Sequence, residues 1–223
     1  MTGHAGQARL SFPNEIWWLV AQEFAAQRDF GGLFLCARLS RTLAGLALPS
    51  LYAIHHEAAR VFDPHSINRK TFVCLWRAII ASGLGKTLFP YCFWIKALKL
   101  GNLYSHLEAL AHNNRRLKAR FFSRPLEKLL IVRGRGRHRT LDVKAIIVKV
   151  AKLVTERIRI LASQEDRRVG ITSLEVSYLP TPNLSKWLSD FSSLESLSVH
   201  DGFVLNSDVA STLRANCPRF RNV

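Results

Sequence analysis

Three groups of residues have side chains of the kinds that chemistry requires: a histidine-rich segment, a Gly-Lys-Thr step and four cysteines. His55, His56 and His65 lie near Asp63, and such groups are potential metal ligands. The segment has no pair of histidines four residues apart on a helix and no second carboxylate, so we expect no zinc-type site. We therefore interpret residues 55–92 as a helical linker that binds no metal or cofactor.

The step Gly85-Lys86-Thr87 resembles the end of a phosphate-binding loop. That loop also needs a glycine five residues before its last glycine, and Ile80 occupies this position. The apolar spacing before it predicts a helix over 71–81, whereas a phosphate loop follows a strand. Nucleotide binding is therefore not expected.

The cysteines and the N-terminal sequence bear on the compartment. No secretory signal is present and no Cys-x-x-Cys pair occurs among the four cysteines, which are Cys36, Cys74, Cys92 and Cys217. Separated thiols of this kind are typical of a reducing compartment, so we expect the cytoplasm, the nucleus or both. No apolar run approaches the roughly 18 residues of a membrane span. A nucleophile elbow is also missing, and we expect no enzymatic activity.

The net charge of +16 is concentrated in the middle of the chain. Residues 91–160 hold seventeen Lys or Arg against four Asp or Glu, which is +13, whereas residues 1–90 carry +4 and residues 161–223 carry −1. The densest part is 115–139, where Glu127 alone opposes ten cations: Arg115, Arg116, Lys118, Arg120, Arg124, Lys128, Arg133, Arg135, Arg137 and Arg139.

This basic segment has three interpretations. It could bind nucleic acid through phosphate contacts and stacking on Phe121 and Phe122, although no motif of a known nucleic-acid-binding module accompanies it. It could instead recruit an acidic or phosphorylated protein, because each guanidinium donates paired hydrogen bonds to phosphate. The interpretation we favour is a solvated basic loop, since runs of charge usually end on the surface.

The segment 12–52 has the apolar spacing of three short helices. Ile16 and Val20 begin the stripe of the first helix. Trp17 and Trp18 are neighbours that point about 100° apart, so they cannot both enter a narrow core. We expect one of the two to be exposed unless a partner covers it. Asp29 is expected to cap the second helix and Pro49 to end the third.

The segment also matches a known pattern, in the order Phe12-Pro13-Asn14-Glu15-Ile16, Val20, Phe24, Asp29, Leu33 and Arg38-Leu39-Ser40-Arg41. It resembles the F-box of fungal proteins, by which substrate receptors dock on the Skp-type adaptor of SCF ubiquitin ligases. The first Phe and Leu39 are conservative departures from the family's Leu and Val. The resemblance implies adaptor docking through Phe12, Pro13, Ile16, Trp17, Val20, Phe24, Leu33 and Leu39.

Further along, an apolar pattern φ-x-x-φ-x-φ recurs with helical stripes after each copy. It predicts four strand–loop–helix units, whose strands contain Ile95, Leu98 and Leu100; Leu126, Leu129 and Ile131; Ile171, Leu174 and Val176; and Leu194, Leu197 and Val199. The last unit resembles the cysteine-containing leucine-rich repeat of F-box proteins, with Cys217-Pro218 at the family's Cys-Pro position and Cys217 expected in the core. Phe220 and Val223 would open a fifth unit, so we expect a partial or truncated array.

Together these patterns predict an α+β fold, in which a three-helix F-box-like domain precedes a short irregular leucine-rich-repeat solenoid. The expected parts are a disordered N-terminus at 1–9, the F-box-like domain at 10–54, the linker at 55–92 and the repeat array at 93–223.

The resemblance implies a non-catalytic substrate-recognition adaptor of an SCF-type ubiquitin ligase. Its partners would be a Skp-type adaptor, a cullin scaffold and an unidentified target protein, with no membrane and no cofactor. The alternative is a basic nucleic-acid-binding protein, or a general protein-interaction repeat protein, without a ligase role.

Overall fold

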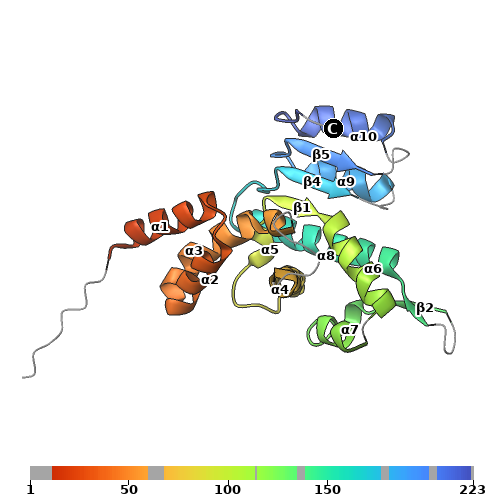
Figure 1. Cartoon of the computed structure of the whole chain (residues 1–223). Helices are drawn as coiled ribbons and strands as arrows, with labels where there is room; N and C mark the ends of the chain where they lie inside the picture. The colour runs from red at the N-terminus through yellow and green to blue at the C-terminus, as the bar shows by residue number, and fades with distance from the viewer. Residues whose placement is uncertain are drawn as a thin grey trace, which may run out of the picture. The chain divides into compact units, whose positions relative to one another are not determined.

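The computed structural model describes residues 12–59, 68–113, 115–134, 139–176, 181–200 and 205–221. The chain divides into two compact units, Met1–Leu51 and Tyr52–Val223. Helices and strands both occur, so the predicted α+β class is confirmed (Figure 1). None of the helices in the described ranges is both long and apolar enough to span a bilayer. The N-terminal segment 1–9, which the sequence predicts to be disordered, lies outside the described residues.

The first unit consists of the three predicted helices, α1 (Asn14–Ala26), α2 (Phe30–Leu39) and α3 (Arg41–Ala53). The predicted cap of the second helix is confirmed, because the Asp29 carboxylate accepts a hydrogen bond from the Gly32 N–H at 2.9 Å. Ser40 has the same role for α3, where its hydroxyl accepts from the Leu43 N–H at 3.1 Å.

The predicted end of α3 at Pro49 is wrong, since the helix continues to Ala53. A proline inside a helix removes one backbone hydrogen bond and crowds the carbonyl of the preceding turn. Packing on both sides of Pro49 offsets this cost. Ala47 and Leu48 are buried before it, and the Ser50 hydroxyl after it accepts a hydrogen bond from the Gln22 amide at 2.9 Å.

The second unit is built on a parallel sheet of the order β1 (Ala97–Lys99), β4 (Ser173–Val176), β5 (Ser196–Val199). Leu98, Leu174 and Leu197 lie side by side in the register, and all three are fully buried. The strands predicted from the first, third and fourth copies of the apolar pattern are thus confirmed. Each strand is followed by a helix, as the repeat pattern predicts.

The second copy of the pattern does not form a strand of this sheet, so that prediction is wrong. Instead, Leu126 precedes and Leu129 ends a short 3₁₀ turn, η2 (Glu127–Leu129), in which residues three apart lie on the same side, and both leucines are buried. The chain then forms an antiparallel hairpin of β2 (Val132–Arg133) and β3 (Thr140–Leu141). A spacing of three therefore does not distinguish this turn from a strand.

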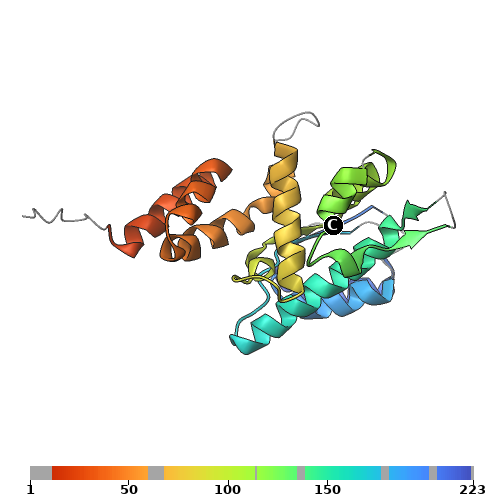
Figure 2. The ribbon, with the colours of Figure 1, turned by 90° about the horizontal axis from the view of Figure 1, so that it is seen from below.

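Besides η2, eight helical segments accompany the sheet in the described part of the second unit. They are η1 (His55–Ala59), α4 (Asn68–Gly83), α5 (Tyr91–Trp94), α6 (Leu100–Asn113), α7 (Arg115–Phe121), α8 (Val143–Gln164), α9 (Thr181–Asp190) and α10 (Ser207–Asn216). The long α8 packs against both α4 and α6, and α9 packs against α10 (Figure 2). The segment 55–92 therefore belongs to the second unit, where α4 contributes to the core.

One backbone hydrogen bond recurs where each successive segment joins the one before it. The Thr172 N–H donates to the Lys96 carbonyl and the Glu195 N–H to the Thr172 carbonyl, both at 2.8 Å, and the Arg221 N–H donates to the Glu195 carbonyl at 2.9 Å. Cys217, four residues before Arg221 in the chain, is buried, and its thiol lies 3.5 Å from the Phe191 carbonyl. Burial also raises the pKa of this thiol. Cys217 thus packs in the core, as the sequence predicts.

Candidate protein-docking site

The first helix presents large apolar side chains to solvent. Ile16 and Leu19 lie on one face of α1, and Phe12 lies just before the helix; all three are exposed. Trp18, beside this face, is 49% exposed, whereas Trp17 is half-buried and meets the Phe12 ring edge-on at 5.9 Å. The prediction that one of the two tryptophans is exposed is therefore confirmed.

A shallow apolar hollow of about 420 Å³ adjoins this face of α1. Trp18 and Leu19 of α1 and Leu46 of α3 supply its apolar wall, and Asn14 and Glu15 lie at its edge. A concave apolar surface next to an exposed tryptophan is the geometry in which a partner's side chain contributes most to affinity. The hollow and the exposed face of α1 form one candidate docking surface.

The second helix adds a further exposed apolar face. Phe34, Leu35 and Leu39 are all more than half exposed, and the Arg38 guanidinium lies 5.8 Å from the centre of the Phe34 ring. Residues 12–39 thus hold seven of the twelve exposed large hydrophobic side chains in the described part of the chain. Large exposed apolar patches of this kind mark interaction sites. We call the seven residues the apolar ridge: Phe12, Ile16, Trp18, Leu19, Phe34, Leu35 and Leu39.

The structure divides the predicted docking residues into three groups. Phe12, Pro13, Ile16 and Leu39 are exposed, Trp17, Val20 and Phe24 are half-buried, and Leu33 is fully buried. The motif comparison missed Trp18, Leu19, Phe34 and Leu35. Helical spacing could have revealed the α2 pair, because Phe34 and Leu35 are adjacent to Leu33 and Cys36 but point to the opposite side of the helix.

Close packing of α1 on α2 explains why Phe24 and Leu33 are withdrawn from the surface. A Cβ atom added at Gly32 would lie 2.8 Å from the Phe24 ring, so only glycine permits this approach of the helices. Leu33, the next residue, is 0% exposed. These two predicted docking residues therefore hold the helices together.

The basic segment is only partly a loop. Arg115 and Arg116 are exposed in the first turn of α7, and Arg133 and Arg139 are exposed on or beside the hairpin, whereas Arg135 and Arg137 lie outside the described residues. Phe121 and Phe122 are buried at 2% and 5% exposure. The suggestion that they stack on nucleic-acid bases is therefore wrong.

Arg77 of α4 holds the end of α7 in place. Its guanidinium donates to the carbonyl oxygens of Arg120 at 2.6 Å and of Arg124 at 3.2 Å, and also to that of Phe121. The last carbonyls of a helix lack partners within the helix, and a cation there also meets the negative end of the helix dipole. The C-terminal half of α7 is thus tied to the core of the second unit.

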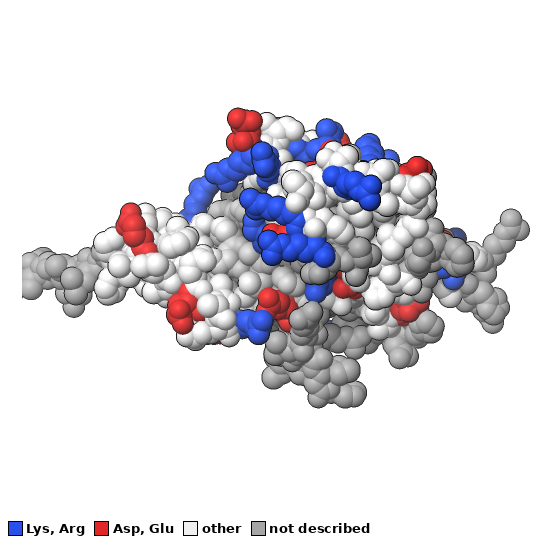
Figure 3. Space-filling model, turned by 90° about the horizontal axis from the view of Figure 1, so that it is seen from above, with Lys and Arg blue, Asp and Glu red and all other residues white. Residues whose placement is uncertain are grey.

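Lys and Arg side chains gather over the middle of the face shown in Figure 3, with single Asp or Glu side chains among them.

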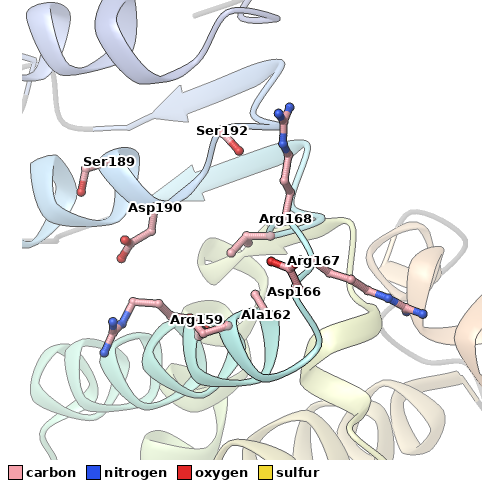
Figure 4. A pocket seen from close by; sticks show the side chains of 10 residues that line it. Arg159, Ala162, Asp166, Arg167, Arg168, Ser189, Asp190 and Ser192 are labelled. Carbon is pink, nitrogen blue, oxygen red and sulfur yellow. The ribbon is translucent and has the colours of Figure 1, made fainter.

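A hollow of about 460 Å³ lies where α8 and α9 end (Figure 4). Its arginines do not converge: Arg159 and Arg167 point away from each other, and they pair with Glu156 at 2.6 Å and Glu165 at 3.3 Å. This hollow therefore lacks the arrangement of an anion site.

The groups considered for chemistry have structural roles instead. Burial lowers the pKa of His55 to about 4, and its Nδ1 donates to the Tyr52 carbonyl at 2.8 Å. Gly85 occupies the turn after α4 with φ of 67°, and the Thr87 hydroxyl donates to the Phe89 carbonyl at 2.7 Å. Within the described residues no group of three or more His, Cys, Asp or Glu side chains is arranged to hold a metal ion.

Comparison of the chain with models of protein families, with curated proteins and with solved structures finds no match. The geometry of the apolar ridge and of the strand–helix units therefore has to carry any functional assignment. The ridge is the more informative of the two, because exposed apolar surface has a direct physical consequence for association.

Proposed function

We propose that the chain is a non-catalytic adaptor of an SCF-type ubiquitin ligase that acts in the cytoplasm or the nucleus. In this proposal the F-box-like first unit docks on a Skp-type adaptor and, through it, on a cullin scaffold. The second unit, a short leucine-rich-repeat-like array, binds the target protein. Its contribution to ubiquitin transfer is proximity, since tethering raises the effective concentration of the target near the conjugating enzyme.

The observation that carries the proposal is the apolar ridge. Burying a large apolar side chain fully is worth about 1.5–3 kcal/mol, and the seven exposed side chains of the ridge constitute a large unused driving force for association. An amphipathic helical surface that meets an apolar groove is a common mode of protein recognition. The position of the ridge within the segment that resembles an F-box supports a Skp-type adaptor as the partner.

Support for the repeat-like array comes from the three parallel strands, which stack in register with a helix after each. Repeat arrays of this kind offer an extended surface for binding other proteins. The hairpin of β2 and β3 interrupts the series between the first and second of these units. The array is therefore irregular, as the uneven spacing of the apolar pattern suggests.

Co-purification of the chain with a Skp-type adaptor after co-expression tests the proposal. The variant Ile16→Asp with Leu19→Asp places two charges on the exposed face of α1 and is expected to abolish co-purification. Both positions are exposed, so the variant is better suited than one at half-buried Val20. Thr42→Asp, an exposed change outside the ridge at the start of α3, is the matched control. Retention of the adaptor by the double variant would reject the docking surface.

Nucleic-acid binding is the second candidate function, because Arg115, Arg133 and Arg139 are exposed in the most basic part of the chain. Phosphate contacts alone would then supply the affinity, which falls steeply with salt. Retention on heparin or DNA at about 0.15 M salt, where the Debye length is about 8 Å, would favour this function. Elution below that concentration would exclude it.

A further inference from the structure

The second unit contains an apolar hollow of about 550 Å³ between α8 and the turn that follows α4. Leu84 of the turn and Leu153 and Ile160 of α8 supply its apolar wall, together with Gly83 and Gly85. Its volume is within the range of about 300–1,000 Å³ that is usual for ligand sites. Its aliphatic wall suits an apolar side chain of a ligand. No aromatic residue lines it, so it offers no platform on which a nucleic-acid base could stack.

The rim of this hollow is cationic. Lys149, Lys152 and Arg157 line it, and the one carboxylate beside them, Glu156, already pairs with Arg159 at 2.6 Å. The Lys149 ammonium donates to the Lys128 carbonyl at 2.8 Å, which holds it in place at the exposed surface. The hollow therefore combines an apolar wall with an excess of positive charge.

Arg157 brings a second cationic group to this rim. Its Nε is buried and has no hydrogen-bond acceptor within the described residues. A buried donor without an acceptor is unfavourable, and more so when the group is charged. A ligand carboxylate would pair with the exposed Lys152 ammonium and with the part of the Arg157 side chain that lines the hollow, while the ligand's apolar side chain occupies it.

We propose that this hollow, with Lys152 and Arg157 at its rim, docks an acidic protein segment that carries an apolar anchor side chain. The proposal deepens the proposed function, because it names the chemical class of the target held by the second unit. A protein segment fits better than single-stranded nucleic acid, whose binding relies on stacking against aromatic side chains, and Phe121 and Phe122 are buried. It also fits better than a membrane surface, which apolar groups reach by protruding.

Fluorescence anisotropy with the full chain tests the proposal. The probe is a fluorescein-labelled acidic peptide with a leucine–phenylalanine pair at its centre. One control peptide has two serines in place of that pair, and a second has glutamine in place of every acidic residue. We expect the first probe to bind at least about tenfold more tightly than either control, since one control lacks the apolar anchor and the other lacks the charged hydrogen bonds.

Matched variants locate the binding. Lys152→Glu and Arg157→Gln are each expected to lower the affinity for the acidic probe by about tenfold. Arg219→Glu makes the same change of charge as Lys152→Glu at an exposed position that does not line the hollow, and we expect less than about a twofold effect. Lys152 is exposed, so its replacement leaves the fold intact. Equal losses in Lys152→Glu and Arg219→Glu would overturn the proposal.

Further outcomes separate this inference from the adaptor function. Tighter binding of a single-stranded RNA probe than of the acidic peptide would overturn the docking site, and so would equal binding of the three peptides. The first-unit variant Ile16→Asp with Leu19→Asp is expected to bind the probe normally. If co-purification with a Skp-type adaptor fails while the probe still binds through Lys152, the adaptor function is wrong and the docking site stands.

Discussion

Leu33 and Leu39 lie six residues apart on α2, and the sequence places both in the docking motif. The structure assigns them opposite roles, because Leu33 is 0% and Leu39 is 68% exposed. Leu33→Ala should therefore destabilise the fold, whereas Leu39→Ala should leave stability unchanged and weaken partner binding. The pair separates a core function from a surface function within one helix.

The magnitudes follow from the two exposures. Replacing a fully buried leucine by alanine costs about 2–5 kcal/mol of unfolding free energy. Full burial of a leucine side chain is worth about 1.5–3 kcal/mol, so covering the 68% of Leu39 that is exposed contributes about 1–2 kcal/mol to binding. That corresponds to about a five- to thirtyfold loss of affinity in Leu39→Ala. Its effect on unfolding should remain within about 0.5 kcal/mol.

Urea denaturation of both variants measures stability, and isothermal titration with a purified Skp-type adaptor measures affinity. Tryptophan fluorescence follows the denaturation of both units, since Trp17 and Trp18 lie in the first unit and the other three tryptophans lie in the second. The comparison of Leu33→Ala with wild type should show a lower midpoint with unchanged slope. Unchanged stability in Leu33→Ala, or equal destabilisation in both variants, would refute the packing of α2 described above. Unchanged affinity in Leu39→Ala would refute only its role in docking.

Two further predictions concern the second unit. Arg77→Met should lower the unfolding free energy of this unit by about 2 kcal/mol, because three carbonyls lose their charged donor. The same variant should speed amide hydrogen exchange in α7. Arg77→Lys should restore less than half of the lost stability. Stability should also fall as the pH drops from about 6.5 to about 4, by up to about 3 kcal/mol, because unfolded His55 binds a proton near pH 6.5 and folded His55 only near 4. Urea denaturation across this pH range should show the decline in wild type and a flatter profile in His55→Leu.

Helical periodicity and the apolar strand pattern predicted much of the fold. The Asp29 cap, the three N-terminal helices and the strands around Leu98, Leu174 and Leu197 follow from local rules that hold wherever such residues occur. The four α-helices α6, α8, α9 and α10 also coincide with the predicted stripes. These features depend on side-chain spacing within a few turns or one strand, which a sequence displays directly.

The candidate site was less accessible to sequence reasoning. The adjacent tryptophans showed that one must be exposed, but not that Trp18 is the exposed one. Membership in the motif did not distinguish Leu33 in the core from Leu39 at the surface. The hollow beside Lys152 and Arg157 was not predicted, because it joins α8 to a turn that lies more than sixty residues earlier in the sequence.

The sequence by itself determined where most helices and strands form, how charge is distributed along the chain, and that two adjacent tryptophans cannot share one narrow core. Tertiary structure alone decided which apolar side chains remain exposed. It also decided that the helix continues past Pro49, that Leu126 and Leu129 turn into the core, and that Phe121 is withdrawn from the basic surface. The physical reason is that burial depends on what packs against a residue from elsewhere in the chain, and its contribution exceeds local preferences.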